Sequence, residues 1–175
     1  MKQPISAQSV MQTKAFAQVE GVWLGLVLTA GFLFCIFLPQ SSWGSLVFLS
    51  VPFFVGWRLC QFRDKILDGA ITFRRALAFC WYTFFYGSLL WAFLLFLYLY
   101  FLDNGRLLRT LNSILKFWSE MEGVTEQFVS QLRDGIVMVS QMTPLEITFS
   151  LFMQSIFWSV PASLLIALIC KRKKR

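Results

Sequence analysis

The chain is 175 residues long, and 57% of its residues are hydrophobic, 18% aromatic and only 14% charged. A composition this apolar excludes an ordinary soluble domain and indicates a protein that lies in a membrane. The formal net charge of +7 does not require a nucleic-acid partner, because the basic residues flank apolar stretches, as they do in membrane proteins.

Three long stretches contain no charged residue: residues 21–57, 76–102 and 147–170. A helix needs about 20 apolar residues to cross the roughly 30 Å hydrocarbon core of a bilayer. The first stretch is too long for one helix, and Pro39 followed by three polar residues divides it. The sequence therefore predicts one all-α, polytopic membrane domain over residues 1–175. Its four transmembrane helices are expected at about 18–38, 42–60, 75–102 and 145–170.

Two segments beside these spans are expected to lie at the membrane surface. Residues 1–17 are polar and predict a short surface helix, followed by an uncleaved first span. Residues 62–73 alternate charged and apolar side chains around an Asp-Gly turn, which predicts a segment along the membrane surface. Pro52 in the second span and Pro161 in the fourth predict kinks, which are compatible with a cavity between helices.

Residues 103–144 form the largest region predicted outside the membrane. Apolar residues recur there at helical spacing, so we expect an amphipathic helical hairpin between spans three and four, with Gly123 ending its first helix. Thr143, Pro144 and Glu146 then predict a capped start of the fourth span. The candidate partner-binding residues lie on the apolar face of the hairpin and are Leu107, Leu111, Leu115, Trp118, Phe128 and Leu132.

Lysine and arginine are distributed unequally along the chain. Most of the sixteen lie near the N-terminus, in the loop after span two or in the C-terminal tail. The positive-inside rule then predicts that both termini face the cytoplasm and that the hairpin is extracytoplasmic. The basic tail is expected to fix this orientation, with binding of lipid headgroups as the alternative. Its residues are Lys171, Arg172, Lys173, Lys174 and Arg175.

The chain lacks the sets of residues that catalysis or ion coupling requires. It has no histidine, no serine or cysteine beside a base, and no cluster of metal-ligand residues. Glu20 is the acid at the cytoplasmic start of the first span, and its position at the edge favours a boundary charge over a coupling group. The four cysteines form no CxxC pair and are expected to be packing residues. We therefore expect a protein that is not an enzyme and uses no cofactor.

Small residues at helical spacing predict close helix packing within the bundle, which we favour over oligomerisation. In a bilayer, such stripes let backbones approach closely where no hydrophobic effect drives association. One stripe is a GxxxG pattern in the first span, and the other runs down the fourth span. The candidate helix-packing residues are Gly21, Gly25, Thr29, Ser155, Ser159, Ser163 and Ala167.

Three motifs and their order give the chain its resemblance to a known family. The motifs are Phe62-Arg63-Asp64 with Asp68-Gly69-Ala70-Ile71-Thr72-Phe73, then Met142-Thr143-Pro144-Leu145-Glu146, then Ser163-Leu164-Leu165-Ile166-Ala167. With the aromatic third span and the basic end, they resemble the bacterial membrane-protein family called domain of unknown function 4199. The resemblance implies a four-span inner-membrane protein without known catalytic residues, and members encoded near a membrane glycosyltransferase suggest such an enzyme as partner.

The leading functional hypothesis is a non-catalytic accessory or scaffold subunit, which contacts membrane lipids and docks an envelope-assembly partner such as a membrane glycosyltransferase. The alternative is a small carrier or lipid flippase, and a third possibility is a membrane-surface organiser that acts through the basic tail. Polarity inside the bundle discriminates between the first two, since a wet cavity favours a carrier and tight packing favours a scaffold. The polar residues concerned are Thr83, Tyr86, Gln154, Ser155, Ser159 and Ser163.

Overall fold

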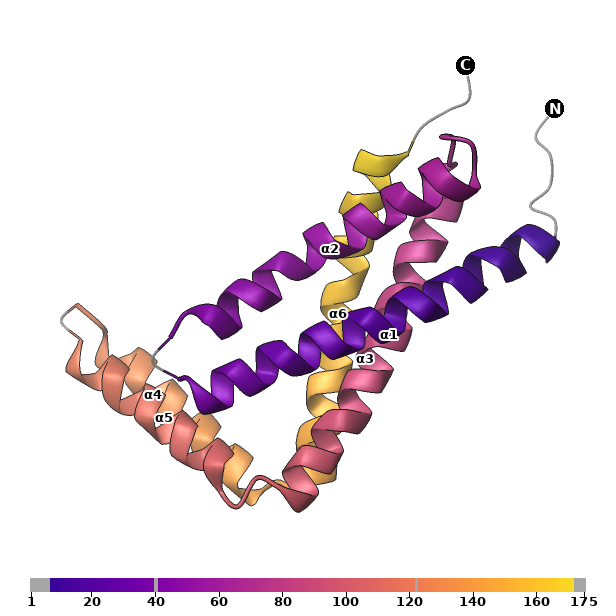
Figure 1. Cartoon of the computed structure of the whole chain (residues 1–175). Helices are drawn as coiled ribbons and strands as arrows, with labels where there is room; N and C mark the ends of the chain where they lie inside the picture. The colour runs from indigo at the N-terminus through magenta and orange to yellow at the C-terminus, as the bar shows by residue number, and fades with distance from the viewer. Residues whose placement is uncertain (1–6, 40, 122, 172–175) are drawn as a thin grey trace.

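The computed structural model describes residues 7–39, 41–121 and 123–171. The described residues form six helices, four of which are long and apolar enough to cross a membrane. This finding confirms the predicted all-helical architecture with four membrane-capable helices (Figure 1). The helices are α1 (Ala7–Phe37), α2 (Trp43–Ile66), α3 (Phe73–Phe101), α4 (Arg106–Glu120), α5 (Glu126–Gln141) and α6 (Pro144–Cys170).

The four long helices are arranged around α3. Helix α1 makes its most extensive contact with α3, and α3 also packs along α6, whereas α2 contacts α1 and touches α3 and α6 only sparingly. The start of α1, the end of α6 and the α2–α3 turn lie at one end of the bundle, which we call the terminal end (Figure 1). The shorter helices α4 and α5 pack on each other at the opposite end, which we call the α4–α5 end.

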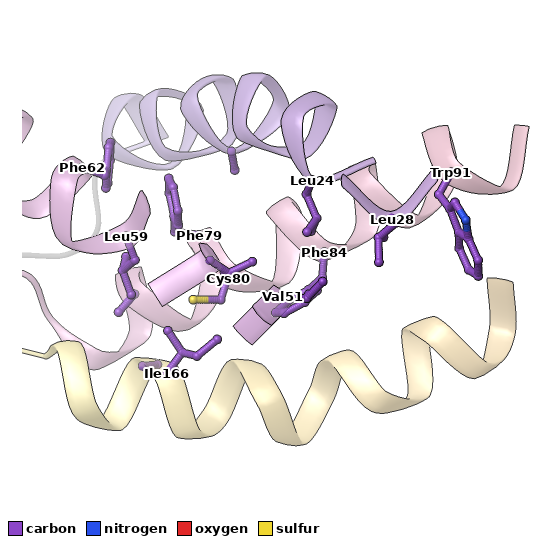
Figure 2. Packing of buried hydrophobic residues seen from close by; sticks show 14 of the residues in the cluster. Leu24, Leu28, Val51, Leu59, Phe62, Phe79, Cys80, Phe84, Trp91 and Ile166 are labelled. Carbon is purple, nitrogen blue, oxygen red and sulfur yellow. The ribbon is translucent and has the colours of Figure 1, made fainter. Parts of the chain in front are cut away.

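Side chains from all four long helices form the buried core (Figure 2). Leu59 and Phe79 are completely buried near the terminal end, and the ring of Phe79 stacks on Phe62 with centroids 4.8 Å apart. Leu24 and Leu28 of α1 continue the core toward the α4–α5 end, where Trp91 of α3 is also buried. Many other large apolar side chains on these four helices stay exposed, as expected where lipid rather than water surrounds a helix.

The first helix begins before the predicted span. A separate surface helix was expected over residues 1–17, but α1 continues without a break from Ala7 into the span, which corrects that prediction over its described part. Thr13 and Ala17 are buried, and the ring of Phe16 lies 5.3 Å from that of Phe62. The early turns of α1 belong to the bundle because they pack on α2 and α3; residues 1–6 lie outside the described part.

The surface segment predicted over residues 62–73 is also shorter than expected. Helix α2 continues to Ile66, and the connection to α3 is a tight turn in which Asp68 and Gly69 have φ of +51° and +79°. The helix continues because Phe62 is buried on Phe79 and anchors its last turns in the core. The Asp-Gly turn was therefore placed correctly, whereas the long surface segment around it was wrong.

Sequence signals for helix ends agree well with the structure. Thr143 accepts a hydrogen bond from the backbone N–H of Glu146, whose carboxylate accepts one from the Thr143 N–H at 2.7 Å. These two bonds form the predicted capping box, which satisfies backbone donors that a helix start leaves unpaired. Gly123, with φ of +89°, lies between α4 and α5 as predicted.

Candidate functional site

A pocket of about 840 Å³ lies between the long helices and extends to α4 and α5. Ligand sites in proteins typically enclose roughly 300–1,000 Å³, so this volume suits a sizeable ligand. Apolar side chains from α1, α2 and α3 form one wall, and side chains from α4 and the end of α5 line the pocket at the α4–α5 end. These apolar residues are Leu28, Phe32, Phe48, Val51, Pro52, Phe84, Trp91, Leu107, Leu111, Val139 and Met142.

Helix α6 supplies most of the polar groups of the pocket. Ser150, Gln154, Ser155 and Ser159 line it, and the hydroxyls of Ser155 and Ser88 share a hydrogen bond of 2.7 Å. Polar residues predicted to mark a wet interior therefore divide into two groups. Gln154, Ser155 and Ser159 line the pocket, whereas Thr83, Tyr86 and Ser163 do not.

The terminal end of the bundle is closed by packing and by an ion pair. Arg58 of α2 donates from Nη2 to Glu20 Oε1 at 2.5 Å and also from Nε to Glu20 Oε2, so the contact is bidentate. The Glu20 side chain is only 13% exposed and that of Arg58 23%. Core residues Leu59 and Ala167 at this end are fully buried. The pocket therefore lies toward the α4–α5 end and does not run the length of the bundle.

Two cysteines lie side by side at the closed end. The Cys60 and Cys170 sulfur atoms are 3.5 Å apart, and Arg63 donates to the Cys170 backbone carbonyl at 3.2 Å. Cys80 is buried and Cys35 partly buried. Within the described residues, no group of three or more metal-ligand side chains comes together.

The glycines of the first predicted stripe lie directly against α3. A methyl group added at Gly21 would be 2.7 Å from Tyr86 Cβ and 3.1 Å from the Gly87 backbone nitrogen, and one at Gly25 would be 3.0 Å from the Gly87 carbonyl oxygen. Thr29 donates to the Gly25 carbonyl at 2.8 Å within the same helix. At these positions only glycine leaves room for the approach of the two backbones.

The second predicted stripe lies on the inner side of α6. Ser159, Ser163 and Ala167 are buried, and Ser155 contacts α3 through Ser88. The Ser159 hydroxyl donates to the Ile156 carbonyl at 2.6 Å, so its polar group is satisfied within the helix. This stripe accompanies the extensive contact between α3 and α6.

The candidate partner-binding residues of α4 and α5 turn mostly inward. Leu107 and Leu111 line the pocket, and Trp118 packs edge-on against Phe128 with ring centroids 5.6 Å apart. Leu115 and Leu132 are partly buried. Of the candidates, Phe128 stays 42% exposed, as does Met121 at the end of α4. Sequence reasoning missed Phe117, Val137 and Met138, which are more exposed than any of the candidates.

The basic tail is described only at its first residue. Lys171 is exposed, and its backbone N–H caps α6 by donating to the Ala167 carbonyl at 3.1 Å. The other candidates for headgroup binding, Arg172, Lys173, Lys174 and Arg175, lie outside the described residues.

A family model matches residues 20–172, which include the pocket and both partners of the buried ion pair. The chain belongs to the family described as protein of unknown function DUF4199. No curated protein and no solved structure matches this DUF4199 chain. The family assignment agrees with the resemblance found in the sequence, and it leaves the function to be argued from the geometry of the site.

The arrangement in this DUF4199 chain suits the binding of a small molecule. The pocket combines a broad apolar wall with a few hydrogen-bonding groups, Gln154 and Ser155 among them, which is the usual composition of a small-molecule site. Its position within membrane-capable helices places it where lipid chains are the most abundant molecules.

Proposed function

We propose that this protein is a non-catalytic accessory subunit that binds a membrane amphiphile and serves an envelope-assembly partner, such as a membrane glycosyltransferase. The 840 Å³ pocket carries the proposal. An apolar wall from α1 and α2 suits hydrocarbon chains, and Gln154 and Ser155 on α6 can hold the more polar end of the same molecule. An amphiphile held in this way is available to a partner enzyme without any chemistry by the subunit itself.

Geometry favours an accessory role over a flippase. A flippase needs a path along which a polar headgroup crosses the bilayer, whereas this pocket stops short of the terminal end. There Leu59, Phe79 and Ala167 are fully buried, and the bidentate pair of Glu20 and Arg58 joins α1 to α2. Binding from one leaflet, with release to a partner on the same side, fits this closed end better.

In the proposed orientation the protein spans the bacterial inner membrane with both termini in the cytoplasm. The start of α1 and the end of α6 lie at the same end of the bundle, which an even number of spans requires (Figure 1). Basic residues at the end of α2 and the start of α3, including Lys65 and Arg74, share this end. By the positive-inside rule it faces the cytoplasm, so the pocket opens toward the outer leaflet.

Filling the pocket is expected to abolish amphiphile binding. Ala162 lines the pocket, and Ala162→Phe places an aromatic ring in the space that hydrocarbon chains would occupy. We expect co-purified lipid, measured by native mass spectrometry in mild detergent, to fall at least tenfold. Val160→Phe, at an exposed position of the same helix outside the pocket lining, is the matched control and should retain lipid. Equal lipid content in wild type and both variants would contradict the proposed binding.

Partner docking is expected to involve the exposed apolar residues near the end of α4. Phe117 in α4 is 59% exposed, and Met121, the C-cap residue four positions later, is 42% exposed. Because exposed apolar patches outside the spans mark interaction surfaces, Phe117→Ser with Met121→Ser should reduce recovery of an envelope-assembly enzyme in affinity purification by at least fivefold. Asn112→Ser, at an exposed polar position of α4, is the control. Unchanged recovery of the same enzyme would count against this surface.

A further inference from the structure

The polar side chains that line the pocket, apart from the indole of Trp91, come from one helix. Along α6, Ser150 and Gln154 are four residues apart, as are Ser155 and Ser159, so each pair shares a face of the helix. The residues that line the pocket from α1 and α2 are all apolar: Leu28, Phe32, Phe48, Val51 and Pro52. A ligand in the pocket therefore meets hydrogen-bonding groups among the apolar side chains of α6, and hydrocarbon alone on α1 and α2.

Gln154 and Trp91 of the pocket carry N–H groups that can donate to a ligand. Gln154 is exposed within a membrane-capable helix, and its amide carries two N–H donors and one acceptor. Trp91 is only 6% exposed, and its Nε1 has no hydrogen-bond partner among the described residues. Figure 2 shows the Trp91 indole directed toward α6. Because a buried donor without a partner is unfavourable, a ligand acceptor that reaches Nε1 is favoured.

The same lining excludes a charged group as the bound acceptor. No described residue that lines the pocket is an aspartate, glutamate, lysine or arginine. A phosphate or free carboxylate in the pocket would therefore lack a counter-ion, which is unfavourable. The acceptor must be neutral. The carbonyl of a carboxylic ester meets both conditions, whereas a polyprenyl chain has no acceptor at all.

We propose that the pocket binds the ester-linked region of a glycerolipid, with ester carbonyls accepting hydrogen bonds from Gln154 and Trp91 and acyl chains along the α1–α2 wall. The proposal rests on amphiphile binding in the same pocket and names the class of the ligand. The charged headgroup remains outside the pocket, at the α4–α5 end. Residue Gln154 is the principal determinant, because it lines the pocket and is exposed.

Matched ester and ether lipids test this assignment. The delipidated full chain in detergent is titrated with dioleoyl phosphatidylethanolamine and with the dialkyl ether of the same chains and headgroup, and binding is measured by native mass spectrometry. Two hydrogen bonds of about 1 kcal/mol each predict roughly a thirtyfold preference for the ester. Gln154→Leu and Trp91→Phe should each lower this preference severalfold while binding of the ether lipid is retained. Met153→Leu, at an exposed position outside the pocket lining, should keep it.

The outcomes separate this inference from the broader proposal. Equal affinity for ester and ether lipids would overturn ester recognition and leave amphiphile binding intact. Displacement of both lipids by an equimolar polyprenyl phosphate would likewise overturn it and assign the pocket to an isoprenoid. Absence of any bound lipid would overturn the proposed function itself. Gln154 is at the protein surface, so loss of the ester preference in Gln154→Leu cannot be attributed to unfolding.

Discussion

Replacement of Gly21 by alanine is expected to destabilise the bundle by roughly 1–3 kcal/mol, because overpacking at a tight helix contact forces backbones apart. The added methyl group would lie 2.7 Å from Tyr86 Cβ, closer than real carbon atoms approach. The Thr83 carbonyl oxygen at 3.2 Å and the Gly87 nitrogen at 3.1 Å belong to the α3 backbone, which cannot turn away as a side chain can. The loss of stability is measured by thermal unfolding in detergent, with size-exclusion chromatography as the readout.

Gly56→Ala is the control for this effect. A methyl group at Gly56 meets Ile166 at 3.7 Å, an ordinary van der Waals distance, so the substitution should leave stability unchanged or raise it through helix propensity. Both variants remove a glycine from a membrane-capable helix, and they differ in what the new methyl group touches. Equal melting temperatures for the two variants would show that the α1–α3 contact tolerates a wider separation than the structure has.

The main features of the fold could be predicted from the sequence because a bilayer sets strict rules. Uncharged stretches near 20 residues, Pro39 in the first of them and the Thr143 capping box placed four long helices and most of their boundaries. The errors lie where tertiary packing decides. Burial of Ala17 draws the polar N-terminal residues into α1, and burial of Phe62 prolongs α2 beyond its predicted end. Neither burial can be read from local periodicity.

Only part of the candidate site could be predicted from the sequence. The sequence marks Gln154, Ser155 and Ser159 as polar residues within a span, and Pro52 as a residue that could shape a cavity. That these residues line the same pocket depends on how α2 and α6 are placed relative to each other, which the sequence does not give. The sequence does not single out Trp91, because the third span contains many aromatic residues. Only the structure shows that its indole nitrogen is buried without a hydrogen-bond partner. Helical spacing identified an apolar face on α4, but it could not predict that this face packs against the bundle.

Loss of either partner of the pair between Glu20 and Arg58 is expected to cost about 1–3 kcal/mol of stability. Their side chains are 13% and 23% exposed, so water screens each charge only in part. Glu20→Gln leaves the Arg58 guanidinium without its counter-charge, and Arg58→Gln leaves the Glu20 carboxylate without its counter-charge. An unpaired charge in a mostly buried site lowers the stability of the fold. The pair also joins α1 to α2 at the closed end, so each variant should loosen this end.

The double variant Glu20→Gln with Arg58→Gln provides the decisive measurement. Two neutral amides leave no buried charge, so its melting temperature should lie above the value expected if the losses simply added, with a coupling of about 0.5–3 kcal/mol. Glu120→Gln, which removes one partner of an exposed pair with Lys116 at 3.8 Å, serves as control and should change little. Additive losses in the double variant would instead mean that the two side chains stabilise α1 and α2 separately, through packing of their aliphatic stems. The closed end would then depend on the core around Leu59 and Phe79 rather than on this charge pair.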